Sequence, residues 1–456
     1  MSDGPLELRV FGLDVVVNVQ PERRDAVARQ WSWCAPDSAT QRSIAPLPGE
    51  PRRVVGAHPE EREPAASTAE APGPIVVDRI TDAPGSRVDV SDYSLTTTLT
   101  GRAISARAGA LVMLHAGGVC DPATGVVAGL VAASGTGKTT ATRHYCTHGY
   151  GYVTDETLIF NDRRDVMPYP KPLSVLVDPE RVGVKEQHCP DDLGMAPPRD
   201  GDLRLGPLVL LDRIRDDAAP VGSADDGAGD DAMPGTANRM DGDDGGGGAH
   251  EPAEPELSEM PLFEALTLIL PQSSAMPQID GCLDLIARIA VAGGGVRRLR
   301  YREIADTLPL LRRAFTAEPQ EPFWRHVPGT WWMQQPDVDP YLPLVTTMPG
   351  AVADDAAPHL DGADALTMDT VLTLAPFVDA LVDDEALEVL TLIGSTPAHL
   401  HGLGAAIHMT LLDGPRSVAD LVDVCTEALG DHPDATALVT RAAHDLLTNG
   451  VVRVAE

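Results

Sequence analysis

The segment 126–145 constrains the fold of this chain more than any other part of the sequence. It reads VVAGLVAASGTGKTTATRHY: an apolar, valine-rich run, then a glycine loop, then residues that can form a helix. A short apolar run that ends in glycines and continues into a helix is typical of a buried strand followed by a tight turn. The segment therefore predicts an α/β domain built around a buried strand.

The loop AASGTGKT at 132–139 is close to the phosphate-binding pattern G-x-x-x-x-G-K-[ST]. Gly137, Lys138 and Thr139 match it, whereas Ala132 stands at the first glycine. Backbone N–H groups and the helix N-terminus surround the phosphates in such loops, and an alanine disturbs them only where φ must be positive. We therefore expect the site to survive this change. The alternative is a glycine-rich turn without a ligand.

The expected ligands of the loop are ATP and Mg²⁺. The lysine of the pattern reaches the β- and γ-phosphates, and the hydroxyl of Thr139 helps to hold Mg²⁺. The residues expected to bind the nucleotide are Ser134, Gly135, Thr136, Gly137, Lys138, Thr139 and Thr140.

Composition excludes several classes of partner. The 456 residues carry 68 acidic and 35 basic side chains, a net charge of −33. Nucleic-acid surfaces need clustered Lys and Arg, so no nucleic-acid partner is expected. Either adaptation to high salt or ordinary acidic solubility explains the excess of acid.

No apolar run approaches the ~20 residues of a membrane span, and the N-terminus lacks the basic-then-apolar plan of a signal peptide. The six cysteines are scattered and form no CxxC pair, which favours buried free thiols in a reducing compartment. We expect a cytoplasmic protein without a membrane partner. The oligomeric state is not predicted.

Four regions follow from the patterning. They are a strand-rich N-terminal part at 1–87 with a disordered loop at 37–74, a domain at 88–316 with a disordered acidic insertion at 216–260, a connector at 317–380 rich in Pro and Asp, and a C-terminal domain at 381–456. The insertion holds thirteen acids against one base, and it has no apolar periodicity. The stretch SRVDVSDYSLTTTLT at 86–100 is predicted to be a strand.

The C-terminal region predicts three helices and a final strand, as in a winged-helix module. A hairpin in EVLTLIG and AHLHG comes first, followed by a helix at 403–412. Ser417 is a natural N-cap for the second helix, and Gly450 ends the third before the strand VVRVA.

The residues around the loop resemble the catalytic domain of HPr kinase/phosphorylase. LHAGGV precedes the loop, SGTGKTT forms it and YVTDE follows it. The resemblance covers residues 88–315 without the insertion, and it implies a P-loop fold akin to phosphoenolpyruvate carboxykinase. PYPKPLSV and VRRLRY suit the later strands of relatives attached to peptide-biosynthesis clusters.

The resemblance implies a role for each matching residue. Lys138 would bind phosphate, Thr139 would hold Mg²⁺ and Glu156 would assist it, Asp155 would be the catalytic base, and His115 would line the active site. Independently, phosphoryl transfer needs a divalent ion and a carboxylate near the acceptor, which a strand end beside the loop can supply.

Plainer roles remain open for these residues. Asp155 can cap a turn, and His115 can be a hydrogen-bonded histidine at a strand end. Lys171 in PYPKPLSV is expected to be solvated rather than to touch phosphate. The glycine-rich segment that HPr kinases place after their Asp pair is missing, so HPr itself and the reverse reaction are not implied.

The stretch from Glu385 to Glu456 resembles PqqD-like proteins, through LHGLGAAIHMTLLDGPRSVADLV. In that family a leader peptide adds a strand to the small sheet. The alternative is a winged-helix domain used for packing or dimerisation. DNA binding is disfavoured because Arg416, Arg441 and Arg453 are the only strong bases there.

The sequence thus predicts an α/β P-loop domain like the C-terminal domain of HPr kinase, with a strand-rich N-terminal part and an α+β winged-helix domain. It predicts an ATP-dependent kinase whose acceptor is a Ser or Thr hydroxyl of a peptide or protein, with a precursor leader peptide as one candidate. The alternative is a catalytically idle adaptor that binds a nucleotide and a peptide partner.

Overall fold

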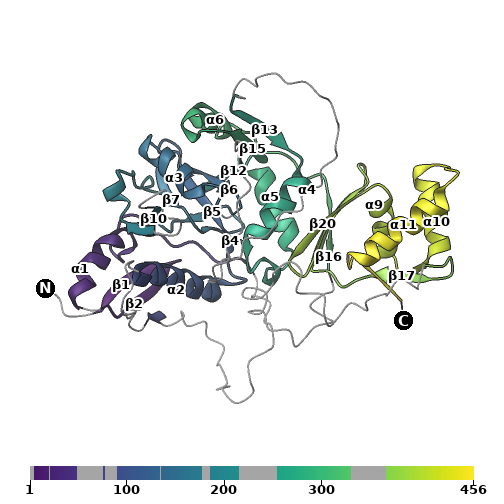
Figure 1. Cartoon of the computed structure of the whole chain (residues 1–456), viewed down its shortest axis with the longest axis horizontal. Coiled ribbons are helices and arrows are strands. Elements are labelled where there is room, and N and C mark those ends of the chain that lie inside the picture. The colour runs from purple at the N-terminus through teal and green to yellow at the C-terminus, as the bar shows by residue number, and fades with distance from the viewer. Residues whose placement is uncertain are drawn as a thin grey trace, which may run out of the picture.

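The computed structural model describes residues 5–19, 21–48, 75–77, 90–133, 135–176, 185–214, 254–329 and 366–455. Over these residues the chain is an α/β protein with mixed sheets and helices. Figure 1 shows a larger part, coloured purple to green, beside a C-terminal part in yellow-green and yellow. Residues 49–74 of the predicted disordered loop lie outside this description, as do residues 215–253, which hold most of the predicted acidic insertion.

A six-stranded mixed sheet forms the centre of the larger part, in the order β13-β15-β12-β6-β5-β7. Its strands are β5 (Ala116–Cys120), β6 (Val126–Val131), β7 (Gly151–Thr154), β12 (Arg204–Arg213), β13 (Glu256–Met260) and β15 (Val296–Tyr301). β6, β12 and β15 are parallel. β7 runs in the same direction as β6, because both are antiparallel to β5 between them. The carboxyl ends of β6 and β7 therefore lie at the same edge of the sheet.

Helices cover both faces of this sheet, which is why its central strands are apolar throughout. The helices are α3 (Lys138–Thr147), α4 (Leu262–Ile269), α5 (Cys282–Ala292) and α6 (Leu308–Ala314). Along β6, Ala128 and Leu130 share one core with α3 and α6. Val127 and Val131 share the opposite core with α4 and α5. The predicted strand–loop–helix unit is confirmed.

The N-terminal residues form a separate sheet, β1-β2-β3, and a helix. These elements are β1 (Leu6–Val10), β2 (Leu13–Val17), β3 (Ile75–Val77) and α1 (Pro21–Gln30). Phe11 and Gly12 join β1 to β2 with φ angles of 52° and 66°. Positive φ at both central residues is what a two-residue hairpin turn of type I′ requires.

The prediction of a strand at 86–100 is wrong. Residues from Val90 onward form helix α2 (Val90–Arg107). The β-branched and alternating residues of this stretch favour a strand, but Leu95, Leu99 and Ala103 recur at a spacing of four and are all buried. Packing of that helical face against the N-terminal core outweighs the weak local propensity.

Smaller sheets complete the larger part. One has the order β14-β4-β8-β9, and β10 pairs with β11. These strands are β4 (Val112–Leu114), β8 (Leu158–Phe160), β9 (Val166–Met167), β10 (Leu173–Leu176), β11 (Lys185–His188) and β14 (Ser273–Ser274). All six cysteines are buried and unpaired, as predicted. Among the described helices, none combines the length and the apolar character needed to cross a membrane.

The C-terminal part holds two small sheets, β16-β18-β19-β20 and β21-β17-β22, and three helices. The strands are β16 (Arg325–Pro328), β17 (Val371–Leu374), β18 (Asp379–Asp383), β19 (Glu388–Ile393), β20 (Thr396–His401), β21 (Arg416–Ser417) and β22 (Val452–Val454), and the helices are α9 (Leu403–Leu412), α10 (Val418–Leu429) and α11 (Ala435–Thr448). Ser417 caps α10 through a capping box with Asp420. Gly450 follows α11 with φ of 68°. The predicted hairpin, caps and helices are confirmed.

Three strands lie where no ordered structure was predicted. β13 occupies the end of the range expected to be a disordered insertion, and it pairs with β15. β16 and β17 lie in the range expected to be a connector, but they pair with β18 and β22 of the C-terminal part. Strand pairing with distant partners, rather than local composition, orders these residues.

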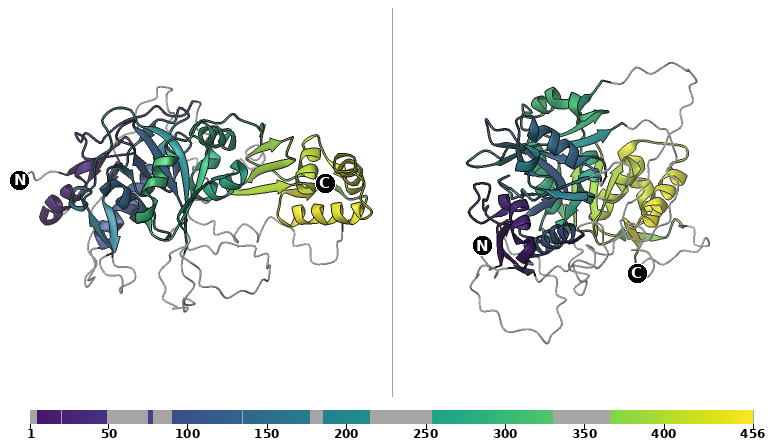
Figure 2. Two further views of the ribbon diagram at one scale, coloured as in Figure 1. Left: turned by 90° about the horizontal axis from the view of Figure 1, so that it is seen from above. Right: turned by 60° about the vertical axis from the view of Figure 1, so that its left-hand side comes forward.

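Within the C-terminal part, the sheet β16-β18-β19-β20 packs against the larger part on one face and against α9 on the other. On one face, Leu381 and Leu390 join the core of α4 and α5. On the other, Val382 and Val389 pack on Ala405 of α9. Figures 1 and 2 show α4 and α5 between the central sheet and this small sheet. The C-terminal part is therefore joined to the larger part by a continuous hydrophobic core.

Candidate functional site

The loop 132–139 joins the carboxyl end of β6 to the first turn of α3. Gly135 and Gly137 have φ angles of 73° and 100°. A Cβ at either position would meet no atom within 4 Å, so glycine is needed there for backbone conformation rather than for space. Ala132 is not among the described non-glycine residues with positive φ, so the alanine adds no backbone strain, as predicted. Ser134 lies outside the described residues.

Lys138 is the first residue of α3, and it points back into the loop. Its Nζ atom donates to the carbonyl oxygens of Ala132 at 2.7 Å and Ala133 at 3.2 Å. Burial lowers the pKa of this amine to about 8, although Asp155 and Glu156 raise it. A buried cation beside a helix N-terminus favours an anion such as phosphate.

The hydroxyl-bearing residues of the loop have different surroundings. Thr136 donates to the carbonyl oxygen of Ala133 at 2.6 Å, which closes the loop on itself. Thr139 donates to Oδ2 of Asp155 at 3.0 Å. Thr140 is exposed in the first turn of α3. Thr139 is therefore the hydroxyl that links the loop to the carboxylates.

Asp155 directly follows β7, and its side chain faces the loop rather than its own turn. The turn is held by the hydroxyl of Thr154, which accepts from the backbone N–H groups of Glu156 and Thr157, each at 3.3 Å. Asp155 is 5% exposed and accepts from the Tyr152 hydroxyl at 2.9 Å. The capping role considered for Asp155 thus belongs to Thr154.

Lys171 is the main departure from the sequence prediction, which expected a solvated side chain. It is 3% exposed, and its Nζ atom lies 3.0 Å from Asp155 and 3.1 Å from Glu156. Burial alone lowers the pKa of Lys171, but the two carboxylates outweigh it and raise the pKa above the ordinary value. The prolines and apolar residues around it in PYPKPLSV are the only local signal, and they do not show which group the lysine meets.

His115 lies between β4 and β5, and its backbone N–H donates to Gln272 at 2.6 Å. Burial is the main cause that lowers the pKa of its ring to about 4; the charge of Lys138 adds to this, while Asp155 opposes it. The backbone of Glu156 also opposes the lowering of this pKa. His115 therefore lies beside the predicted carboxylates as a neutral imidazole at pH 7.

Except for Ser134, the predicted residues thus converge at one edge of the central sheet. The oxygens of Thr139, Asp155 and Glu156 are the hard ligands that Mg²⁺ prefers. The loop and Lys138 offer N–H donors and a positive charge to a phosphate chain.

No family model, no curated protein and no solved structure matches this chain. The resemblances to HPr kinase/phosphorylase and to PqqD-like proteins therefore remain predictions from short motifs.

Proposed function

We propose that this chain binds ATP with Mg²⁺ at the loop 132–139 and transfers the γ-phosphoryl group to a Ser or Thr hydroxyl of a peptide or protein. The contact between Thr139 and Asp155 carries the proposal, because it links the expected phosphate-binding helix to the expected base over 3.0 Å. A strand–loop–helix unit with a carboxylate at the same edge of the sheet, at the end of the next strand but one, has the parts that phosphoryl transfer requires.

Each residue has a task in this proposal. The backbone N–H groups of Gly135 and Gly137 and the amine of Lys138 hold the phosphates. Asp155 accepts the proton of the acceptor hydroxyl. Bound Mg²⁺, with Thr139 and Glu156 among its ligands, would neutralise charge on the phosphates. His115, a neutral ring beside Glu156, orients the groups around it and shields them from water.

The proposed acceptor is a peptide or protein held by the C-terminal part. Its resemblance to PqqD-like domains supports this, since such domains add a peptide strand to a small sheet. The continuous core through β18 and β19 holds this part at a fixed place relative to the larger part. A fragment starting at Asp383 would lack β16, β17 and β18, so tests of docking require the full chain.

One observation favours the second candidate, a catalytically idle adaptor that binds nucleotide and peptide. Lys171 lies between Asp155 and Glu156, within 3.1 Å of each. A cation between the two carboxylates already compensates the charge that Mg²⁺ would otherwise balance. In the adaptor, nucleotide would bind through the loop, and no transfer would follow.

The test uses the full chain, γ-labelled ATP and a panel of peptides that carry Ser or Thr. Asp155→Asn should keep ATP affinity within a few-fold and cut transfer about 100-fold or more, the usual scale for a positioned base. Asp162→Asn, an exposed carboxylate near β8, is the matched control and should transfer as wild type does. Lys138→Ala should abolish ATP binding, because the phosphates lose their charged partner.

The outcomes separate the two candidates. Labelling that is lost in Asp155→Asn but kept in Asp162→Asn supports the kinase. Equal labelling by Asp155→Asn and wild type would show that another group is the base. ATP binding that depends on Lys138, without labelling of any peptide, would support the adaptor. Equal ATP affinity of wild type and Lys138→Ala would rule out both.

A further inference from the structure

Two histidines and a glutamate meet on the small sheet, away from the loop. Glu388 opens β19, and its partner across the ladder is His401 of β20, while His399 lies opposite Leu390. Because side chains alternate along a strand, all three polar side chains share one face with Leu390. That is the face covered by α4, whose Phe263 meets the His399 ring edge-on at 5.8 Å.

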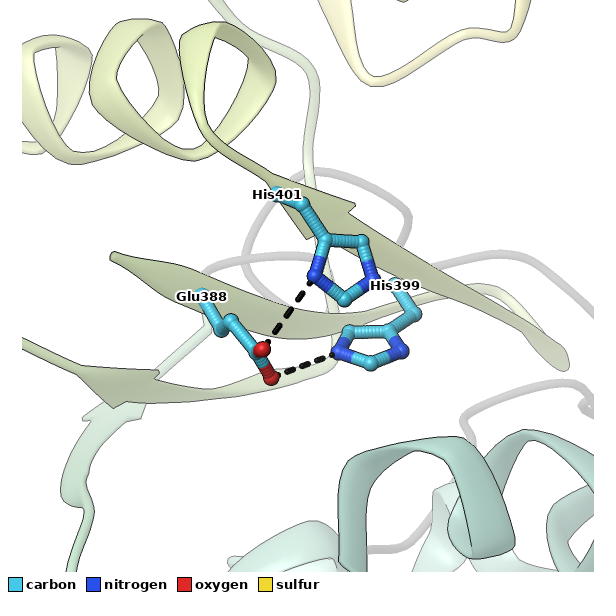
Figure 3. A group of neighbouring side chains, drawn as sticks. All are labelled: Glu388, His399 and His401. Carbon is cyan, nitrogen blue, oxygen red and sulfur yellow. Dashed lines mark hydrogen bonds and ion pairs between the residues drawn. The ribbon is translucent and has the colours of Figure 1, made fainter. Parts of the chain in front are cut away.

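Both imidazoles face the same carboxylate. Figure 3 shows the two rings on β20 side by side, with Glu388 between the strands. His399 Nε2 lies 3.1 Å from one carboxylate oxygen, and His401 Nδ1 lies 3.3 Å from the other. The ring centroids are 3.9 Å apart, and one ligand atom from each residue lies within 4.8 Å of the other two.

This spacing fits a metal site. Ligand atoms about 2.0–2.1 Å from a tetrahedral zinc ion lie about 3.3 Å from each other; the three ligand atoms here all lie within 4.8 Å of one another, so small side-chain shifts bring them to that spacing. The site is partly sheltered: the His399 side chain is 13% exposed, Glu388 32% and His401 59%. The hairpin ladder fixes the backbone of the three residues, so no loop has to become ordered when an ion binds.

We propose that Glu388, His399 and His401 form a binding site for a divalent transition-metal ion, with Zn²⁺ as the preferred ion. Two imidazoles and one carboxylate are the ligand types of zinc sites with three protein ligands and an open fourth position. Mg²⁺ and Ca²⁺ prefer oxygen ligands and are excluded by the two nitrogens. His401 is the most exposed of the three residues, so water or a side chain of a docked partner would reach the ion from its side.

The site is independent of the proposed kinase activity. It depends on β19, β20 and α4 alone, and it uses no residue of the loop or of its carboxylates. The sequence signal is the HLH triplet at 399–401, since two histidines at a spacing of two on a strand project to one face. From the sequence alone, the triplet predicts only a strand of the hairpin.

The experiment is a competition titration of the full chain with Zn²⁺ against a chromophoric chelator, in excess Mg²⁺ to fill oxygen-rich sites. Wild type should bind one Zn²⁺ per chain at micromolar or tighter affinity. Glu388→Gln, His399→Gln and His401→Gln should each weaken Zn²⁺ binding at least about 100-fold. Replacing a residue that only hydrogen-bonds to a metal ligand already lowers metal affinity by about 10–100-fold, and these three are ligands themselves. His432→Gln, an exposed histidine between α10 and α11, is the matched control and should bind as wild type does.

A second measurement guards against misfolded variants. Zn²⁺ should raise the melting temperature of wild type and of His432→Gln, but not that of His401→Gln, whose exposed ring contributes little to the fold. If His399→Gln melts early without metal, His401→Gln and Glu388→Gln decide the result. Equal Zn²⁺ affinity in wild type and these two variants, or no binding at micromolar concentrations, overturns the proposal.

Discussion

Replacing Lys171 with methionine tests the charge balance of the candidate site. Lys171 and its partner Asp155 are each 3% exposed in their side chains and lie 3.0 Å apart. Methionine keeps the volume but leaves Asp155 buried without its cation. Breaking a buried pair by removing one partner costs about 3–5 kcal/mol, so we expect the free energy of unfolding to fall by about that amount. Glu156 also loses its ion pair with Lys171, but it is partly exposed to solvent and therefore contributes less than Asp155 to this decrease in the free energy of unfolding.

The pH dependence of this contribution follows from the sign of the pKa shift. The folded-state pKa of Lys171 is raised above its ordinary value, so the stabilisation is fully present below pH ~10.4 and is lost only as pH rises through the folded pKa. The difference between wild type and Lys171→Met should therefore be the same at pH 7 and pH 8.5. Millimolar Mg²⁺ should restore part of it if the two carboxylates bind the ion.

Denaturant unfolding, followed by far-ultraviolet circular dichroism, measures the effect. The double variant Lys171→Met/Asp155→Asn should lose at least about 1 kcal/mol less than the sum of the single variants, because neither charge is then buried alone. Arg163→Met, an exposed cation on a nearby turn, is the control and should stay within about 0.5 kcal/mol of wild type. Additive losses, or a Lys171→Met variant as stable as the control, would refute the reasoning.

Three further predictions concern the fold. Gly117→Ala should lower the free energy of unfolding by about 1–3 kcal/mol in a urea titration, because its Cβ would collide with the Thr142 hydroxyl of α3; an unchanged midpoint would contradict this. His326 lies 2.6 Å from buried Asp379, and this hydrogen bond raises its pKa, so its contribution is fully present below pH ~6.5 and is lost as pH rises through the folded pKa. His326→Gln should therefore cost more stability at pH 5.5 than at pH 8.5, and equal costs would argue against the ion pair. Deleting residues 217–253 should leave the melting temperature within about 2 °C, since loop length costs little and β13 begins only at Glu256; a larger drop in a calorimetric scan would mean that the segment is structural.

Much of the fold was predictable wherever local pattern and packing agree. The strand before the glycine loop, the helix after it and the capped helices of the C-terminal part each carry their own signal, such as the capping box at Ser417. Helix α2 was not predictable from propensity, because its conformation is determined by the burial of Leu95, Leu99 and Ala103 in the N-terminal core. β16 and β17 were missed because their partners are far away in the sequence.

The candidate site divides in the same way. The loop and Asp155 could be predicted because their chemistry is written in contiguous residues. Lys171 could not, since its burial depends on the chain folding back so that a residue sixteen positions after Asp155 meets it. The pair of histidines on β20 carries a signal at a spacing of two, but it has meaning only once Glu388 is known to lie across the ladder.

The core shared through β18 and β19 also sets an order for events during synthesis. The central sheet can close once β15 has been made, at Tyr301, whereas β17 has to wait for β22 at Val452. At 5–20 residues per second, the ribosome needs roughly 8–30 s for the residues between them. For the first part of that interval, until β18 and β19 have been made, the faces of α4 and α5 that later contact Leu381 and Leu390 remain uncovered on the nascent chain. A chaperone that binds apolar helices would find its target there, after the glycine loop is in place and before the sheet of the C-terminal part has formed.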